Sequence, residues 1–368
     1  MTRRPHGCSR DRCGSPGCSE GTCGGATRDE HGLPQAREPG IREKTMYADR
    51  PCAGMRAGRD SAKRLRTRAA FLLSAIGAFP ARGSSEAPLQ ASRDASTVTV
   101  ASEGRPILTY RYGDAPFKPY VKTLCTPGGA QLLRDSPSDH VHHRGLMFAL
   151  AVNGKDFWAE GPESGRQISL GAAETTAAAN AVRIDHRLAW TPSGESTASA
   201  IEDRSIIVHG FVHGATLLSW ATLLRPAPGS DRIVLTGSHY QGLGMRWVES
   251  MDGRDAFLHA AGDPGPIVRG VERLTPSTWT SYTADVGERS VTVALFDHPR
   301  NPRSPSGMFT MFKPFSYLSA TPNVWKRPLE VKAGEAVLFR YGVAAWDGVP
   351  GRTAIETLYR NWGDLSRE

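Results

Sequence analysis

The stretch AVRIDHRLAW, residues Ala181–Trp190, decides the fold class of this 368-residue chain. Its apolar side chains recur at every second position, and Arg183, Asp185 and Arg187 lie between them. Successive side chains of a β-strand point to opposite faces, so this alternation predicts a strand with one buried side and one solvent-facing side. His186 falls on the apolar face, and we expect it to be a core histidine.

Runs of the same period recur along most of the chain. They predict further strands at residues 97–101, 106–112, 146–152, 205–211, 216–224, 231–236, 290–296, 307–312 and 336–346. The pair Asn153-Gly154 predicts a tight hairpin turn. Near the C-terminal end, residues 355, 358, 359 and 362 form one apolar helical stripe. The pattern therefore predicts an all-β protein, either two large packed sheets or a closed barrel, with a short C-terminal helix and one domain over residues 95–368.

The charge and the cysteines are concentrated at the N-terminal end. The formal net charge is +8, from 45 Lys and Arg against 37 Asp and Glu, and residues 1–68 hold 15 basic and 8 acidic side chains. The rest of the chain is close to neutral, which argues against a nucleic-acid partner for the folded body. Five of the six cysteines lie in the first 52 residues. We expect the body, which keeps Cys125, to fold without disulfides.

A basic stretch followed by an apolar one predicts an export signal. Basic residues between 63 and 68 precede the apolar run AAFLLSAIGAF at 69–79, and small residues follow it. The run is too short to span a bilayer, so no transmembrane segment is predicted; the alternative interpretation is a buried helix. We expect residues 1–54 to be a disordered or mis-assigned extension and residues 55–86 a signal peptide, with translation starting at Met55 or Met46. The mature protein would then be secreted or periplasmic.

The candidate chemistry is concentrated in the heptapeptide DHVHHRG at residues 139–145. It precedes a predicted strand, so we expect it at the rim of a sheet. In extended geometry His140, His142 and Arg144 would share one face, and Asp139 and His143 the other. Two imidazoles about 7 Å apart on one face can flank a sugar hydroxyl as acid and base.

The same histidines have two other interpretations. His140 and His142 would hold a divalent metal if a third ligand came from elsewhere, with His239, Asp297 and His298 as candidates. Histidines at the end of a strand also serve as structural hydrogen-bond donors. The sequence therefore leaves the cofactor open.

Two later segments, SHYQGLGMRWVE at 238–249 and FDHPRNP at 296–302, carry further polar groups. Their glycines and prolines predict tight or rigid loops near strand ends, where functional side chains are common. We expect Glu249 or Asp297 to be the carboxylate partner of the histidines. The candidates for substrate binding are Asp139, His239, Arg246, His298 and Asn301.

The heptapeptide and the segment NGKDFW at 153–158 resemble the bacterial PmoA-like family, whose members carry the label methane oxygenase PmoA. The segments at 242–249 and 297–302 and the pairs GE, RY and DG at 334–335, 340–341 and 347–348 follow in the same order. The resemblance covers residues 105–364. It implies an exported, β-rich protein, and the family label implies an oxygenase, for which imidazole ligands would suit copper.

The resemblance also implies, by analogy of fold, a large antiparallel β-sandwich of the supersandwich type found in aldose-epimerase-like and polysaccharide-lyase-like proteins. On this basis we predict an exported carbohydrate-active protein of hydrolase, lyase or epimerase type, whose partner is a carbohydrate or another small molecule. The predicted catalytic residues are His140, His142, His143, Arg144, Glu249 and Asp297, with Arg144 stabilising oxyanion charge. The alternatives are a copper- or iron-dependent oxygenase and a non-catalytic glycan-binding module.

Overall fold

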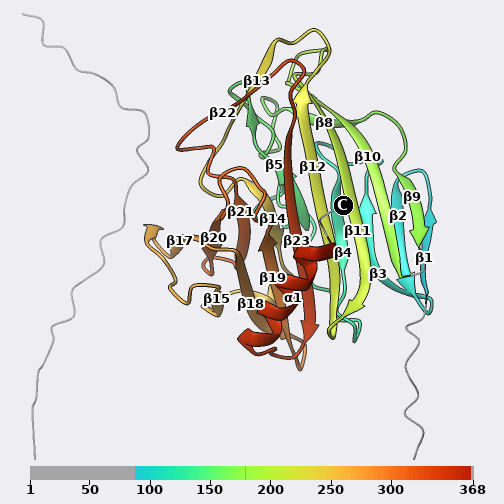
Figure 1. The fold of residues 1–368 in the computed structure, drawn as a ribbon, viewed down its shortest axis with the longest axis vertical. Helices are drawn as coiled ribbons and strands as arrows, with labels where there is room; N and C mark the ends of the chain where they lie inside the picture. The colour runs from blue at the N-terminus through green and yellow to red at the C-terminus, as the bar shows by residue number, and fades with distance from the viewer. Residues whose placement is uncertain (1–87, 179, 366–368) are drawn as a thin grey trace, which may run out of the picture. The chain divides into compact units, whose positions relative to one another are not determined.

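The computed structural model describes residues 88–178 and 180–365. Regular structure in these residues is almost entirely β-strand, and the strands that pair do so in antiparallel fashion (Figure 1). This confirms the predicted all-β fold with large antiparallel sheets and a short C-terminal helix. The predicted N-terminal extension and signal peptide, residues 1–54 and 55–86, lie outside the described residues.

The first sheet has ten strands in the order β1-β2-β3-β4-β5-β14-β21-β20-β17-β16. Neighbours in its second half come from distant parts of the chain, and β14 lies between β5 and β21. The strands are β1 (Leu89–Arg93), β2 (Thr97–Ser102), β3 (Arg105–Arg111), β4 (Tyr120–Leu124), β5 (Leu146–Ala149), β14 (Gly242–Arg246), β16 (Ile267–Arg269), β17 (Glu272–Pro276), β20 (Gly307–Met311) and β21 (Tyr317–Thr321).

The second sheet has nine strands in the order β15-β18-β19-β23-β12-β11-β10-β8, and β9 also pairs with β10. Its long central strands give it a broad face toward the first sheet. The strands are β8 (Arg166–Ser169), β9 (Glu174–Ala178), β10 (Ala181–Thr191), β11 (Ala200–Val212), β12 (Ala215–Pro226), β15 (Phe257–His259), β18 (Trp279–Val286), β19 (Arg289–Asp297) and β23 (Val337–Asp347).

A third, four-stranded sheet has the order β22-β13-β6-β7. Its strands are β6 (Ala151–Val152), β7 (Lys155–Asp156), β13 (Arg232–Thr236) and β22 (Leu329–Lys332). Asn153 and Gly154 join β6 to β7 with φ values of 51° and 78°. Both residues occupy the left-handed region that a tight primed turn requires, so the predicted hairpin is confirmed.

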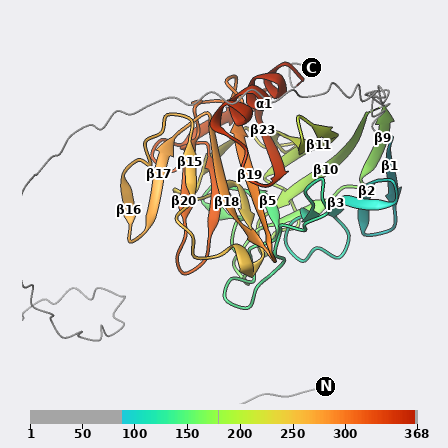
Figure 2. The same ribbon diagram turned by 90° about the horizontal axis from the view of Figure 1, so that it is seen from below.

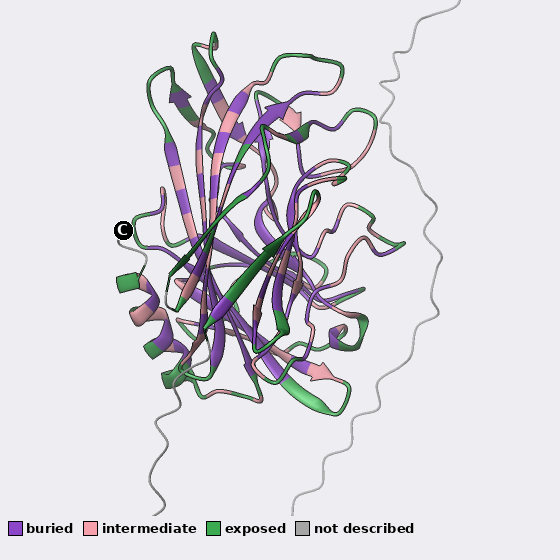
Figure 3. Cartoon of the chain, turned by 90° about the vertical axis from the view of Figure 1, so that its right-hand side faces the viewer, coloured by how far each residue is buried: buried purple, intermediate pink, exposed green. Residues whose placement is uncertain are grey.

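The hydrophobic core lies between the two large sheets. Along β10 the apolar positions are buried, whereas Arg183 and Arg187 are exposed, as the alternating pattern predicts. Rings from both sheets meet in this core: Phe148 of β5 lies 6.3 Å from Trp190 of β10 and 5.9 Å from Phe339 of β23, between ring centroids. Figure 3 shows buried segments along the strands and exposed segments mainly in loops and on one side of the helix.

The helix α1 (Arg352–Leu365) covers the outer face of the second sheet beside β23 (Figures 1 and 2). Its buried residues are Ile355, Leu358 and Trp362, which confirms the predicted apolar stripe. They belong to a second hydrophobic cluster with side chains of β12, β18, β19 and β23. In the described residues no helix is long and apolar enough to cross a membrane.

Candidate functional site

The heptapeptide forms a compact turn rather than the extended segment that was predicted. The backbone N–H of His140 donates to the Pro137 carbonyl at 3.0 Å, and that of His143 donates to the His140 carbonyl at 2.9 Å. The turn gathers all three imidazole rings, with centroid separations of 4.6 to 5.6 Å. The predicted division of these side chains between two faces is therefore wrong.

Gly145 ends this turn where the chain enters β5. Its φ is +50°, and a Cβ at this position would lie 2.3 Å from the carbonyl oxygen of Val121 on β4. A side chain would be strained by the backbone conformation and would also displace the neighbouring strand. Glycine therefore lets the histidine turn lie tightly against the first sheet.

The three histidines form part of the wall of a pocket of about 320 Å³. The rest of the wall comes from β16, β17, β20, β21 and two connecting segments, far from the heptapeptide in sequence. The lining residues are His140, His142, His143, Tyr240, Arg269, Glu272, Phe309, Met311, Pro314, Phe315 and Tyr317. The wall is mainly aromatic and imidazole, with one cation and one carboxylate, which is typical of a small-molecule site.

Two of the three imidazoles, His142 and His143, have lowered pKa values. His143 is buried, and burial together with the neighbouring His142 lowers its pKa to about 2, so it stays neutral. Burial also lowers the pKa of His142, and Lys118 adds to this effect. His142 is only half-buried and, among the described residues, neither of its ring nitrogens has a hydrogen-bond partner. It is therefore a neutral imidazole with both nitrogens available to a ligand.

Tyr317 and Trp158 form the inner part of the site beside His143. The Tyr317 ring stacks on His143 with a centroid separation of 4.9 Å, and Trp158 lies edge-on at 6.4 Å from His143. The Tyr317 hydroxyl, Trp158 Nε1 and His143 Nδ1 are buried without a hydrogen-bond partner in the structure. Gly244 makes room for them, because a Cβ there would lie 1.9 Å from the Tyr317 hydroxyl oxygen. Unsatisfied buried groups of this kind are rare, and two of them belong to His143 and Tyr317, whose side chains line the pocket.

Glu272 and Arg269 supply the charged groups of the pocket wall. Arg269 donates from Nη2 and Nε to Glu272 Oε1 at 2.6 and 3.1 Å. His239 Nε2 lies 3.2 Å from Glu272 Oε2. The predicted substrate-binding residue His239 is thus next to the pocket, and its carboxylate partner is Glu272, which the sequence did not reveal.

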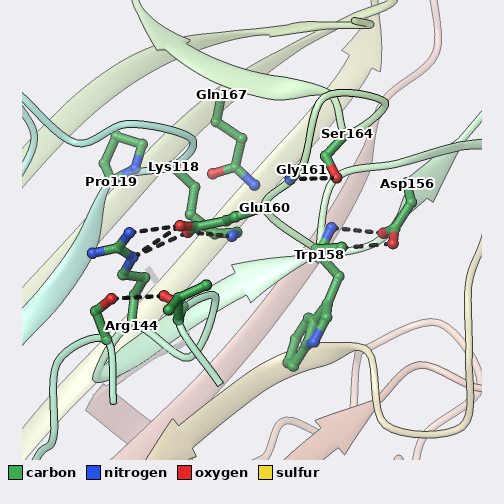
Figure 4. A network of polar contacts seen from close by, with 12 residues as sticks. Lys118, Pro119, Arg144, Asp156, Trp158, Glu160, Gly161, Ser164 and Gln167 are labelled. Atoms are coloured by element: carbon green, nitrogen blue, oxygen red, sulfur yellow. Dashed lines mark hydrogen bonds and ion pairs between the residues drawn. The ribbon is translucent and has the colours of Figure 1, made fainter. Parts of the chain in front are cut away.

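A buried ion-pair network lies behind the histidine turn (Figure 4). Glu160 accepts three hydrogen bonds from Arg144, at 2.6 to 3.1 Å, and one from Lys118 Nζ at 2.9 Å. Arg144 also lies 3.6 Å from Asp135. Arg144 was predicted to stabilise oxyanion charge at the site. The structure corrects this, because its guanidinium is held by two carboxylates and does not line the pocket.

Arg246 and Asp139 form a second layer on another side of the pocket. Arg246 is buried with its guanidinium 3.7 Å from the ring centroid of Phe315, which lines the pocket. Its Nη2 lies 3.4 Å from Asp139 and 3.5 Å from Asp252. Asp139 also lies 3.3 Å from His140 Nδ1, so the carboxylate is next to the first histidine.

Glu249 does not reach the pocket. It begins the short 3₁₀ helix η1 (Glu249–Met251), its side chain is 82% exposed, and it pairs with Arg134 at 3.3 Å. The expectation that Glu249 is the carboxylate partner of the histidines is therefore corrected, because this side chain projects into solvent at the start of η1.

Asp297, His298 and Asn301 lie in a different part of the molecule, beside α1. Asp297 is fully buried and accepts hydrogen bonds from Ser304, Asn301 and both the hydroxyl and the backbone N–H of Ser306. Asn301 links it to β23 through the backbone of Arg340. His298 packs against Trp362 at 5.7 Å. These residues organise a loop, so their predicted roles in catalysis and substrate binding are corrected.

The described residues contain no group of three or more His, Cys, Asp or Glu that could hold a metal ion. His140 and His142 are close together, but two of the proposed third ligands, Asp297 and His298, are in the loop beside α1. The third, His239, is engaged by Glu272. The donor set in this part of the chain therefore does not fit the metal site that the sequence left open.

A sequence model of a family of unknown function, DUF6807, matches residues 97–360. A search of curated proteins found no match. Among solved structures, GH36 alpha-galactosidase AgaA from Geobacillus stearothermophilus is similar at 9% identity and a TM-score of 0.40, over 71% of this chain and 41% of that one. A variant of that enzyme in complex with 1-deoxygalactonojirimycin is similar at 9% identity and a TM-score of 0.39, over 74% of this chain and 42% of that one. A polysaccharide lyase is similar at 10% identity and a TM-score of 0.23, over 72% of this chain and 33% of that one. The chain spans less than half the length of these proteins.

Proposed function

We propose that this chain, which belongs to the family of unknown function DUF6807, binds a sugar in the histidine pocket and acts on it by proton transfer. The observation that carries the proposal is His142. It is a half-buried imidazole with a lowered pKa, it lines the pocket, and both its nitrogens lack partners among the described residues. A neutral histidine in a pocket is suited to act as a general base near neutral pH.

The composition of the wall supports a sugar as the ligand. Tyr240, Phe309 and Phe315 provide flat apolar surfaces, against which the C–H face of a sugar ring can pack. Glu272, Arg269 and the imidazoles offer acceptors and donors for hydroxyl groups. A pocket of about 320 Å³ is the size of a small-molecule site.

The roles of the histidines follow from their surroundings. His142 would take a proton from a hydroxyl or C–H group of the sugar, or return it to a leaving oxygen. His140, whose Nδ1 lies 3.3 Å from Asp139, would be the second proton-transfer group. His143 is buried and neutral, and together with Tyr317 it would shape the wall against which the ligand packs.

Substitution of His142 tests the proposal. The variants His142→Ala and His142→Gln would be assayed with the wild type on a panel of glycans, by chromatography of the products. We expect a loss of about 10²–10⁴-fold in kcat/KM with an unchanged melting temperature. His213→Ala is the matched control, because His213 is an exposed histidine that pairs with Asn361 on α1.

Three results would count against the proposal in different ways. Full activity in both His142 variants would reject His142 as the proton-transfer group. Glycan binding by the wild type without any conversion would favour the glycan-binding module. Activity that requires added copper or iron would favour the oxygenase implied by the PmoA-like resemblance. That resemblance, the export signal and the secreted or periplasmic location stay predictions from the sequence.

A further inference from the structure

We infer that the sugar bound by this pocket is uncharged, a neutral hexose or its glycoside rather than a uronic acid. The inference rests on the proposed function and goes further, because it names the substrate class. It comes from the balance of charges around the pocket. Four cations, Arg269 in the wall and Lys118, Arg144 and Arg246 behind it, each contact at least one carboxylate.

In the wall itself the cation and the carboxylate are paired one to one, although the Arg269 side chain is 74% exposed. Arg269 is bound by Glu272, and the other oxygen of Glu272 faces His239. Glu272 is buried apart from about a tenth of its side chain, so its negative charge is poorly screened by water. A carboxylate on the ligand would meet Glu272 as a like charge before it could take Arg269 from it.

The two cations behind the histidine turn are also neutralised. Lys118 and Arg144 share Glu160, and Arg144 contacts Asp135 as well. The side chains of Lys118 and Glu160 are 0% and 3% exposed, so this pair is screened from any ligand by protein. Breaking it to recruit Lys118 to a substrate would leave a buried charge uncompensated.

Arg246 is the last of these four cations, and its Nε and Nη1 have no hydrogen-bond partner among the described residues. Its guanidinium, however, lies against the Phe315 ring, and it is not among the residues that line the pocket. It also contacts both Asp139 and Asp252. A ligand carboxylate would therefore face two acidic groups for this one cation.

The consequence is a site suited to hydroxyl groups and not to a carboxylate. His142 and His143 are neutral imidazoles, and a buried carboxylate without a paired cation is costly. Elimination from a uronic acid is assisted by a cation that neutralises the sugar carboxylate while the adjacent C–H loses its proton, and the four cations described above are all bound to carboxylates. The charge balance therefore favours hydrolysis or epimerisation of a neutral sugar over a lyase reaction.

Matched pairs of ligands test the inference. Binding of methyl glucoside and methyl glucuronide, and of methyl galactoside and methyl galacturonide, would be measured by titration calorimetry on the wild type. We expect the neutral member of a pair to bind about tenfold more tightly or better. Equal or tighter binding of the uronide would overturn the inference but leave a sugar site in place. If no member of either pair and no glycan on the panel binds, the proposed function itself fails.

The variant Glu272→Gln tests whether this charge is the cause. It keeps the shape of the side chain and leaves Arg269 with no carboxylate in contact, so the preference for the neutral sugar should fall about tenfold or reverse. The matched control is Glu330→Gln, which removes the carboxylate of the exposed cross-strand pair Arg232–Glu330, 3.4 Å apart in the third sheet. A preference that is unchanged in Glu272→Gln, with the protein still folded, would overturn the electrostatic account.

Discussion

Replacing Glu160 by Gln should destabilise the protein strongly, because it removes the carboxylate that two buried cations share. Glu160 accepts one hydrogen bond from Lys118 and three from Arg144. Arg144 would keep Asp135, at 3.6 Å, as a partner. Lys118 has no other carboxylate in contact among the described residues, and its side chain is fully buried. The perturbation is therefore a single buried ammonium group without its counter-charge.

The expected loss is about 3–5 kcal/mol in the free energy of unfolding, the usual cost of removing one member of a buried ion pair. The glutamine oxygen can still accept one hydrogen bond, which places the loss nearer the lower value. A domain is commonly stable by about 5–15 kcal/mol, so the variant should remain folded but unfold at much lower denaturant concentration.

The pH dependence of the loss identifies its cause. Burial already lowers the pKa of Lys118, and Glu160 opposes that shift. Without Glu160 the pKa falls further, whereas in the unfolded chain it is about 10.4. Between these two values the unfolded chain holds more protons than the folded one, so the stability of the variant rises with pH. The wild type shows the same rise over a narrower range of pH, because Glu160 keeps the pKa of its Lys118 closer to the unfolded value. The difference between the two proteins should therefore be smaller at pH 9.5 than at pH 7.

Guanidinium unfolding followed by tryptophan fluorescence, at both pH values, provides the measurement. Glu330→Gln is the control, since an exposed pair of this kind contributes about 0–1 kcal/mol. A loss below about 1 kcal/mol for Glu160→Gln would refute the reasoning, since it would mean that Lys118 is hydrated or neutral in the folded protein.

Three further predictions concern the turn, the corrected loop and acid stability. Gly145→Ala should lose about 2 kcal/mol or more because of its contact with Val121, measured by thermal unfolding, whereas Gly287→Ala, also at positive φ but with open space around it, should lose less. Asp297→Ala should lower the free energy of unfolding by about 3 kcal/mol, because four hydrogen bonds to the carboxylate are lost. Calorimetry should show unchanged sugar binding, and lost binding by the folded variant would mean that Asp297 belongs to the site after all. Burial lowers the pKa of His143 to about 2 and of His186 to about 4, so as the pH falls these histidines bind protons in the unfolded chain before they do so in the folded one. Between pH 6.5 and pH 4 each histidine should therefore lower the free energy of unfolding by up to about 1.4 kcal/mol per pH unit. In His186→Gln, the free energy of unfolding measured with urea should depend less steeply on pH than in the wild type. An equal dependence on pH would contradict this assignment.

The strands could be predicted because their signal is local. In β10 the apolar face and the charged face alternate residue by residue, and the structure buries and exposes them accordingly. His186 was predicted to be a core histidine, and it is buried with its Nδ1 2.9 Å from the Tyr110 hydroxyl. The stripe on α1 is equally local, with Ile355 and Trp362 on its buried side.

The site could be predicted only in part, because its other half depends on the order of strands. The heptapeptide does line a pocket, but Glu272, Phe309 and Tyr317 reach it through β17, β20 and β21, whose places in the sheet no local pattern reveals. The second obstacle was the turn at residues 139–145. Strand alternation was assumed there and placed His143 on the opposite face from His140 and His142, whereas the turn brings the three rings together. Tyr240, beside the predicted His239, was within reach of sequence reasoning.

The packing of α1 on the second sheet has a consequence for partly unfolded states. If α1 detaches while β12, β18, β19 and β23 stay paired, Trp279, Phe296 and Trp346 lose the cover of Ile355, Leu358 and Trp362 and face water. A chain in this state presents an uncovered aromatic surface of the kind that drives aggregation. Docking of the helix is therefore what protects this face of the sheet from self-association.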